Sequence, residues 1–314
     1  MSKRAFVFPG QGAQYVGMGQ EFVDEFPVAK QVFEEASDYL GYDMKKLCFD
    51  GPEEELVKTE NTQPALLTTS IAMLKVLEQE GFDCQITAGL SLGEYGALVK
   101  AKSLKFSDAV QIVRKRGKYM QEAVPIGVGT MAAILGLDRP QVIECLRASQ
   151  GHGIVETANF NSPGQIVLSG EIKAVEAAVA KAVELGAKKA VILPVSAPFH
   201  CSLLKPAGEK LRAELMNYNI NAPVIPVVSN YNAKFLEDKD MVIPSLVEQV
   251  SKSVLWEDSV ELMLENGVER FIEIGPGKTL ASFIKRIAKN VNAKVEIQNV
   301  ENMETFRALM AGIK

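Results

Sequence analysis

The sequence is poor in the residues that bind metal ions or form disulfide frameworks. Its 314 residues include only two histidines and four cysteines. The cysteines, Cys48, Cys84, Cys145 and Cys201, are scattered along the chain without any C-x-x-C pair. Metal sites in proteins usually need Cys or His ligands clustered at short spacing, so we expect no metal centre. Four unpaired thiols are typical of a protein from a reducing compartment.

Long apolar runs and an excess of positive charge are missing as well. No segment approaches the roughly 18 apolar residues of a membrane span, and the run from Ala5 to Pro9 is too short for a signal-peptide core. These features predict a cytoplasmic protein without membrane contact. The formal net charge is −5, whereas nucleic-acid binding calls for a concentrated basic face, so we expect no nucleic-acid partner.

The chain does contain alternating strand and helix patterns, which predict an α/β fold. Short apolar runs followed by turn residues indicate strands, and apolar residues at helical spacing indicate the helices between them. The expected strands are residues 4–8, 85–89, 224–229 and 271–275, and the expected helices lie within 17–40, 64–79, from 92 onward, 107–122 and 260–265. This order predicts a parallel sheet flanked by helices.

A different pattern occupies the middle of the chain. Between residues 127 and 196 the order is strand, helix, strand, strand, helix, strand, at 130–135, 140–149, 154–160, 165–169, 174–185 and 189–193. This βαββαβ order predicts a ferredoxin-like subdomain. Because 314 residues exceed the size at which one core usually stops growing, we interpret residues 127–196 as an insertion. The large subdomain is then formed by residues 1–126 and 197–314.

The segment Gly89-Leu90-Ser91-Leu92-Gly93 matches the motif G-x-S-x-G. A strand is expected before it and a helix after it, which is the context that this motif requires. Such a sharp turn exposes the serine hydroxyl, and the amide that follows lies at a helix N-terminus, where it stabilises an oxyanion. Ser91 is therefore a candidate nucleophile, and the alternative is a chance Gly-Ser turn.

A serine nucleophile needs a base within hydrogen-bond reach, and histidine is the usual one. His152 lies between two glycines in a polar loop of the insertion, which indicates an exposed turn residue. His200 follows directly where the chain leaves the insertion, and loops at such boundaries commonly line active clefts. His200 is therefore the candidate base, the alternative being a structural histidine.

Arg116 has the wrong helical phase for a surface charge. It lies within the apolar stripe of the helix expected at 107–122, three residues after Val113 and four before Met120. A buried guanidinium needs an anionic partner, and its planar fork suits a carboxylate. The partner is either a substrate carboxylate or an acidic residue of the protein itself.

Two glycine-rich stretches resemble nucleotide-binding motifs, but their spacing is wrong. In Gly10-Gln11-Gly12-Ala13-Gln14-Tyr15, a tyrosine occupies the place of the third glycine. In the segment ending Gly277-Lys278-Thr279, Ile272 stands where a phosphate loop requires glycine. We therefore expect no nucleotide cofactor, and the loop at Gly10 could instead supply a second backbone amide to an oxyanion.

Several motifs along nearly the whole chain together resemble those of malonyl-CoA:acyl carrier protein transacylases and of the related acyltransferase domains of fatty acid and polyketide synthases. These motifs are Phe8-Pro9-Gly10-Gln11-Gly12-Ala13-Gln14, Asn61-Thr62-Gln63-Pro64-Ala65, Ser91-Leu92-Gly93-Glu94-Tyr95, Arg116-Gly117-Lys118-Tyr119-Met120-Gln121, Asn159-Phe160-Asn161-Ser162-Pro163-Gly164-Gln165, Phe199-His200 and Glu273-Ile274-Gly275-Pro276-Gly277.

The resemblance implies a hydrolase-like core with a ferredoxin-like insertion and an active site between them. It implies transfer of malonyl from malonyl-CoA to the phosphopantetheine thiol of acyl carrier protein through a malonyl-serine, without a cofactor of the enzyme. The implied roles are nucleophile (Ser91), base (His200), oxyanion amides (Gln11, Leu92), a main-chain carbonyl that orients the base (Gln249), malonyl carboxylate clamp (Arg116), neighbours of the pantetheine arm (Asn159, Asn161) and a malonyl-selective residue (Phe199).

One position departs from the family pattern, and two other functions stay open. The family commonly has histidine immediately before the nucleophile, where this chain has Leu90. A serine thioesterase or carboxylesterase would use the same motif, but it usually carries its histidine near the C-terminus. A non-catalytic scaffold that binds the carrier protein is the other alternative, and it would leave the serine turn and an inward Arg116 without a purpose.

Overall fold

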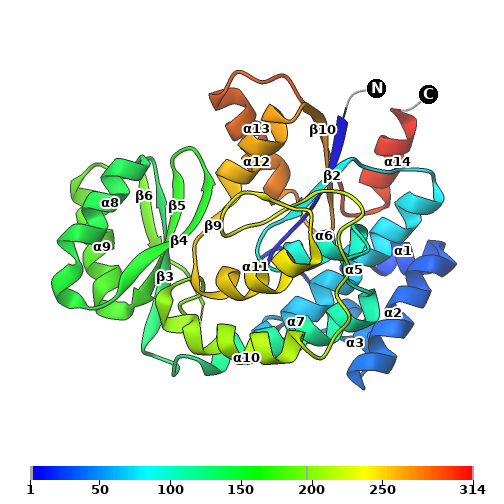
Figure 1. Ribbon diagram of the computed structural model, residues 1–314, viewed down its shortest axis with the longest axis horizontal. Coiled ribbons are helices and arrows are strands. Elements are labelled where there is room, and N and C mark those ends of the chain that lie inside the picture. Colours follow the sequence, from blue (N-terminus) through cyan, green and yellow to red (C-terminus); the bar gives the residue numbers. More distant parts are fainter. Residues whose placement is uncertain (1–2, 196, 313–314) are drawn as a thin grey trace.

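Strand β1 (Lys3–Phe8) lies in the middle of a six-stranded sheet, the larger of two sheets in the computed structural model (Figure 1). The structure describes residues 3–195 and 197–312; Ser196, the last residue of the expected insertion, lies outside them, as do residues 1, 2, 313 and 314. The strand order is β11-β10-β1-β2-β7-β8. The other strands are β2 (Ile86–Gly89), β7 (Val227–Val228), β8 (Phe235–Leu236), β10 (Val268–Ile274) and β11 (Glu296–Val300).

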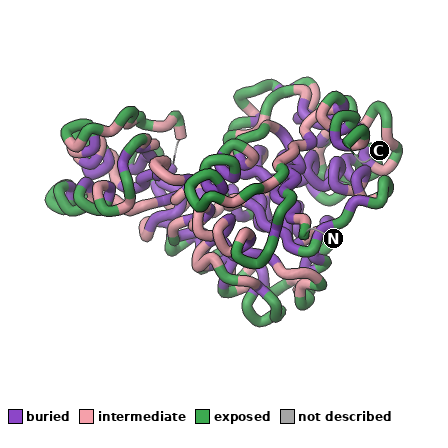
Figure 2. Tube along the Cα trace, turned by 90° about the horizontal axis from the view of Figure 1, so that it is seen from above, coloured by how far each residue is buried: buried purple, intermediate pink, exposed green. Residues whose placement is uncertain are grey.

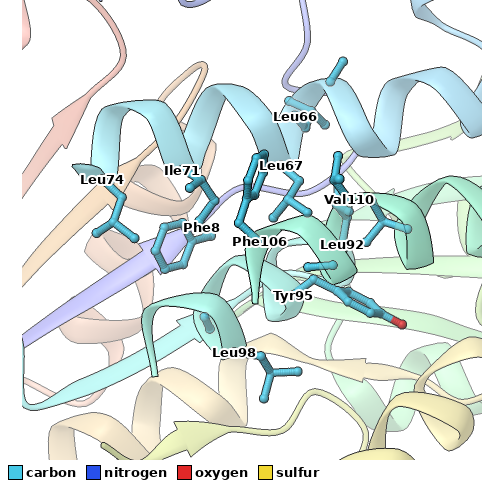
Figure 3. Close-up of a cluster of buried hydrophobic side chains, with 14 of the residues drawn as sticks. Phe8, Leu66, Leu67, Ile71, Leu74, Leu92, Tyr95, Leu98, Phe106 and Val110 are labelled. Carbon is cyan, nitrogen blue, oxygen red and sulfur yellow. The ribbon is translucent and has the colours of Figure 1, made fainter. Parts of the chain in front are cut away.

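Both faces of this sheet are buried, as expected for parallel strands covered by helices. All pairs are parallel except β7 with β8. Successive side chains of a strand point to opposite faces, and in β1 both Phe8 and Val7 are buried. Phe8 belongs to the core cluster on one face, and Val7 belongs to the cluster on the other. Figure 3 shows Phe8 among side chains from the helices of its face.

The helices of the large subdomain divide between these two faces. One face is covered mainly by α2, α5, α6 and α7, and the other by α12 and α13. The helices outside the small subdomain are α1 (Gln20–Glu25), α2 (Pro27–Leu40), α3 (Met44–Phe49), α4 (Glu53–Leu56), α5 (Thr59–Gln79), α6 (Gly93–Lys100), α7 (Phe106–Glu122), α10 (Lys205–Leu215), α11 (Lys239–Ser251), α12 (Trp256–Glu265), α13 (Thr279–Asn290) and α14 (Met303–Ala311), with a short 3₁₀ turn η2 (Ser202–Leu204).

The small subdomain forms the separate lobe drawn in green in Figure 1, and it has its own core. Its elements are β3 (Gly129–Leu135), α8 (Arg139–Ala148), the 3₁₀ turn η1 (Gln150–His152), β4 (Val155–Ser162), β5 (Gln165–Glu171), α9 (Ile172–Glu184) and β6 (Lys189–Ile192). These strands pair antiparallel in the order β6-β3-β5-β4. In Figure 2 purple buried chain runs through both lobes.

The prediction of a parallel sheet with a βαββαβ unit is confirmed, and the differences concern bounds and additions. The helical stretch 17–40 is broken at Phe26, since Pro27 starts a new helix. The strand expected at 224–229 has only two residues, Val227–Val228. The small sheet gains a fifth strand, β9 (Val254–Leu255), from far along the chain, which pairs parallel with β4 and ties the two lobes together.

Candidate active site

The candidate site lies at the carboxyl ends of β1 and β2, where ligands bind in open parallel sheets. These strands are neighbours in register, with Phe8 opposite Gly89. The loop after β1 therefore lies level with Ser91, which follows β2. The loop at Gly10 also packs closely against the turn that carries Ser91, because the O atom of Leu90 is only 2.6 Å from the position that a Cβ on Gly10 would occupy.

The turn at Ser91 is the sharp strand-to-helix bend that its motif predicts. Ser91 has a φ of 52°, in the left-handed region that L-residues rarely adopt. A Cβ on Gly89 would lie 1.9 Å from the carbonyl carbon of Gly93, and a Cβ on Gly93 would lie 2.1 Å from the O atom of Phe8. Both glycines are therefore required by close packing of the backbone rather than by their own φ angles.

Gly93→Ala is expected to destabilise the fold by about 1–3 kcal/mol, because the added methyl group overlaps the backbone of β1. Chemical denaturation measures the change in the free energy of unfolding. Gly151→Ala is the matched control, since a Cβ there meets no atom within 4 Å. Equal stability of the two variants would contradict the packing argument.

His200 reaches Ser91 from far along the chain. Its Nε2 lies 2.7 Å from Ser91 Oγ, and its Nδ1 lies 2.8 Å from the main-chain O of Gln249. Because a carbonyl oxygen only accepts hydrogen bonds, Nδ1 carries the proton of the neutral ring, and Nε2 is left to accept the Ser91 hydroxyl proton. The arrangement is that of a nucleophile, a base and a group that orients the base.

The electrostatic surroundings keep His200 neutral. Burial lowers the pKa of His200 from 6.5 to about 4, and the Arg116 guanidinium lowers it further, whereas the hydrogen bonds to the carbonyls of Gln249 and Lys252 oppose this shift. A neutral imidazole is the form that accepts a proton. His200 is therefore in the basic form at neutral pH.

We expect the reactivity of Ser91 to depend on pH according to this lowered pKa. The rate of Ser91 labelling by a fluorophosphonate should stay flat as the pH falls through 6.5 and should decrease only near pH 4. Because the pKa in the folded state is below that in the unfolded state, the His200 contribution to stability is complete above pH 6.5 and decreases as the pH falls toward 4. Circular dichroism at each pH checks that the protein is folded, and a decrease in labelling centred at pH 6.5 would contradict the assignment.

Arg116 points inward from α7, as its helical phase predicts, and only 1% of its surface is exposed. Nη1 donates to Gln63 Oε1 at 2.7 Å, and Nη2 donates to Gln249 Oε1 at 2.9 Å and to Ser91 Oγ at 3.1 Å. All three acceptors are neutral oxygens. Within residues 3–195 and 197–312, Arg116 makes no ion pair with an acidic side chain, so the alternative of an internal salt bridge is wrong.

The expected oxyanion amides belong to Gln11, in the loop after β1, and to Leu92, the N-cap residue of α6. Both residues line the same cavity as Ser91 and His200. In the described part of the chain neither amide donates to a protein acceptor, so both are available to a developing negative charge.

The cavity beside Ser91 has a volume of about 290 Å³ and is walled by both subdomains. The remaining predicted residues, Asn159 and Asn161 from β4 and Phe199 beside the base, all line it and are 8% exposed. Asn161 Oδ1 is buried without a hydrogen-bond partner among the described residues, which leaves an acceptor for a ligand donor. Leu90, the departure from the family pattern, lines the cavity with an apolar side chain.

A second, outer cavity of about 830 Å³ adjoins the inner one. The two share the lining residues Gln11, Gly12, Leu193, Val195 and Phe199. They therefore form one gorge, which leads from the surface past Phe199 to Ser91. Lys58 and Lys118 lie on the wall of the outer cavity.

Three polar residues of the site were missed as functional residues by the sequence reasoning. Gln63 Oε1 accepts a hydrogen bond from Arg116. Asn230 Oδ1 accepts the main-chain amide hydrogen of Ser91. Glu94 lies one turn after Ser91 and has no exposed surface. Gln63 and Glu94 lay inside family-like motifs, and Asn230 directly follows a predicted strand. These positions were the signal that could have found them.

Comparison with known proteins decides the family. The model of the acyl transferase domain family matches residues 5–312. The chain belongs to the acyl transferase family. A relative in this family, the malonyl CoA-acyl carrier protein transacylase of Escherichia coli (strain K12), is 49% identical over 93% of this chain and 95% of its own.

Solved structures of acyl transferases agree with this assignment. The malonyl CoA-acyl carrier protein transacylase of Clostridium perfringens has a TM-score of 0.95 at 49% identity, covering 99% of this chain and 97% of that one. A malonyl-transacylase solved in complex with its type II PKS acyl-carrier protein has a TM-score of 0.93 at 44% identity, covering 97% of each chain. The expected hydrolase-like core with its added subdomain is thereby confirmed.

The helices and the potential metal ligands of the described residues were also the subject of sequence expectations. Across residues 3–195 and 197–312, none of the helices combines the length and apolar character needed to cross a bilayer. Among the same residues, no three His, Cys, Asp or Glu side chains are grouped closely enough to hold a metal ion.

Proposed function

We propose that this acyl transferase moves the malonyl group from malonyl-CoA to the phosphopantetheine thiol of acyl carrier protein through a malonyl ester of Ser91. The close relatives named for this reaction support it. The observation that carries the proposal is the placement of Arg116. Its buried guanidinium has no acidic partner among the described residues and lies 3.1 Å from the nucleophile oxygen.

This placement suits a short acyl group that ends in a free acid. In a malonyl thioester a single methylene separates the carboxylate from the reacting carbonyl. A carboxylate on the Arg116 fork therefore brings the thioester carbonyl to Ser91 Oγ, and it supplies the anion that the buried guanidinium lacks. Acetyl groups have no such anchor, so the geometry favours malonyl over acetyl.

The acylation step follows from the contacts of His200. Nε2 takes the Ser91 hydroxyl proton as Oγ attacks the thioester carbonyl carbon, and the amides of Gln11 and Leu92 stabilise the resulting oxyanion. The C–S bond then breaks, and the CoA sulfur receives the proton from Nε2. His200 returns to its neutral form, and the malonyl group is an ester of Ser91.

Transfer to the carrier protein runs through the same atoms in reverse. The phosphopantetheine thiol gives its proton to His200, and its sulfur attacks the ester carbonyl. Ser91 Oγ leaves and regains the proton. Every step uses only side chains, backbone amides and the two substrates, so the proposed reaction needs no cofactor of the enzyme.

The gorge accommodates the arm that both substrates share. The outer cavity of about 830 Å³ opens to the surface, and the inner cavity holds the acyl group. Asn159 and Asn161 stand on the inner wall, where they contact the inner end of the pantetheine arm, and Phe199 lines both cavities. We further propose a cytoplasmic location, which agrees with the four free cysteines.

Intact-mass analysis tests this function. The protein is incubated with malonyl-CoA, then with holo acyl carrier protein, and with the apo carrier as control. We expect a single malonyl adduct and one equivalent of CoA without acceptor, then loss of the adduct and sustained CoA release only with the holo carrier. Sustained CoA release without a carrier would instead indicate a thioesterase, and absence of any adduct would favour a non-catalytic scaffold.

A further inference from the structure

Glu94 is a buried carboxyl group that takes no part in the reaction steps above. It lies in α6, one turn after Ser91, and has no exposed surface. Its Oε2 accepts hydrogen bonds from the Asn230 amide at 3.0 Å and from Gln249 Nε2 at 2.7 Å, and its Oε1 accepts one from Ser245 Oγ at 3.4 Å. Burial raises the pKa of Glu94 to about 7 although these hydrogen bonds oppose the shift, so the position is costly for an acid.

One of these contacts supports the bend that carries the nucleophile. The main-chain N–H of Asn230 donates to Glu94 Oε2, and the side chain of Asn230 hydrogen-bonds the backbone of the turn at two positions. Its Oδ1 accepts the Ser91 amide hydrogen, and its Nδ2 donates to the O atom of Gly89 at 2.7 Å. Glu94 therefore fixes the position of Asn230, and Asn230 in turn hydrogen-bonds the strained backbone of Ser91.

The other strong contact sets the orientation of the Gln249 amide. A side-chain amide has one donor end and one acceptor end, and here the donor Nε2 is occupied by Glu94 at 2.7 Å and by the O atom of Ser91 at 3.0 Å. The acceptor Oε1 therefore faces Arg116 Nη2. The reverse orientation would turn an NH₂ group toward a cation. The main-chain O of the same residue orients His200.

We propose that Glu94 is a positioning residue that places the nucleophile, the base and the clamp at once, through Asn230 on one side and Gln249 on the other. The inference rests on the proposed function for the role of Arg116 as carboxylate clamp. Glu94 itself touches neither the acyl group nor the reacting atoms. It acts through its hydrogen bonds to Asn230 and Gln249 and through a Coulombic attraction to the Arg116 guanidinium.

The test compares Glu94→Ala with Glu94→Gln. Alanine removes the shared acceptor, so kcat/KM for malonyl transfer should decrease on the order of a hundredfold, the loss that a misplacement of about 1 Å causes. The decrease should be larger for malonyl than for acetyl, because only malonyl uses Arg116. Glutamine places its oxygen where Oε2 lies and donates its NH₂ to Ser245, so it should restore most of the activity.

Two further variants keep the test decisive if Glu94→Ala does not fold. Gln249→Met removes the amide that joins Glu94 to Arg116 but keeps the main-chain O for His200, and it should lose malonyl selectivity over acetyl. Ser245→Ala removes the long contact to Glu94 Oε1 and a hydrogen bond to Ser229 Oγ, but leaves the contacts of Glu94 with Asn230 and Gln249, and should retain wild-type kinetics. Folded Glu94→Ala or Gln249→Met with wild-type kcat/KM and wild-type selectivity would overturn the proposal. So would a folded Glu94→Gln that is as impaired as Glu94→Ala.

Fluorophosphonate labelling of Ser91 separates this inference from the proposed function. The labelling rate depends on Ser91 and His200 but needs no malonyl-CoA. If the wild-type chain labels quickly but accepts no malonyl, the proposed function fails, and slower labelling of Glu94→Ala still supports the positioning role. If the wild-type chain transfers malonyl while folded Glu94→Ala or Gln249→Met transfers it with wild-type kcat/KM and selectivity, the positioning role fails alone.

Discussion

Arg116→Ala is expected to lower kcat/KM for malonyl transfer by about 30-fold to 5,000-fold, which corresponds to the roughly 2–5 kcal/mol lost when one partner of a buried charge pair is removed. Acetyl transfer should be spared or rise, because acetyl has no carboxylate to pair with the guanidinium. The physical reason is the burial of Arg116, at 1% exposure, within reach of Ser91.

Initial rates with malonyl-CoA and acetyl-CoA, each measured with holo acyl carrier protein, check this selectivity change. Arg116→Lys should fall between the wild type and the alanine variant, since it keeps the charge but loses the planar fork. Arg114→Ala is the matched control, because Arg114 lies on the same helix and donates to the O atom of Leu40, away from the cavity. Equal losses for malonyl and acetyl would refute the clamp.

Ser91→Ala is expected to abolish the covalent malonyl adduct and to reduce transfer at least about 10⁴-fold, the scale of loss when a catalytic serine is removed. The fold should persist, because Ser91 Oγ bonds only His200 and Arg116 among the described residues and leaves the backbone of the turn intact. Intact-mass analysis after incubation with malonyl-CoA measures the adduct directly.

The histidine variant sharpens this prediction. Ser91 and His200 act as a unit, so His200→Ala should be similarly impaired, and the double variant should be no worse than the single ones. Additive losses would show that the two side chains work independently. A malonyl adduct that survives in Ser91→Ala, found on another residue by peptide mapping, would overturn the assignment of the nucleophile.

Much of the fold was predictable because local patterns agree with it. Apolar runs such as residues 4–8 and 85–89 became neighbouring parallel strands, and the order within residues 127–196 became the small subdomain. The bounds and the long-range pairing of the strands were less predictable. The strand expected at 224–229 is short, and β9 pairs with β4, which lies about a hundred residues earlier, a pairing that two residues cannot reveal.

The residues of the candidate site likewise include some that the sequence could predict and some that it could not. Ser91 was visible because its motif encodes a local turn, and Arg116 was visible because its phase conflicts with a surface position. His200 was selected because it follows directly where the chain leaves the insertion, and because the other histidine, His152, lies in a polar loop. Asn230 and Glu94 escaped notice because their partners lie more than a hundred residues away, and a polar residue shows its purpose only when its partner is known.

Neighbouring residues are enough to indicate the type of chemistry: a serine in a strand-to-helix turn, one usable imidazole and an inward guanidinium. How these groups meet follows from the three-dimensional packing of the chain. Ser91, Arg116, His200 and Gln249 come within hydrogen-bond distance because parallel strands end at one edge and α7 and α11 pack beside it. Distances between remote residues depend on packing of the whole chain, and no local pattern contains that information.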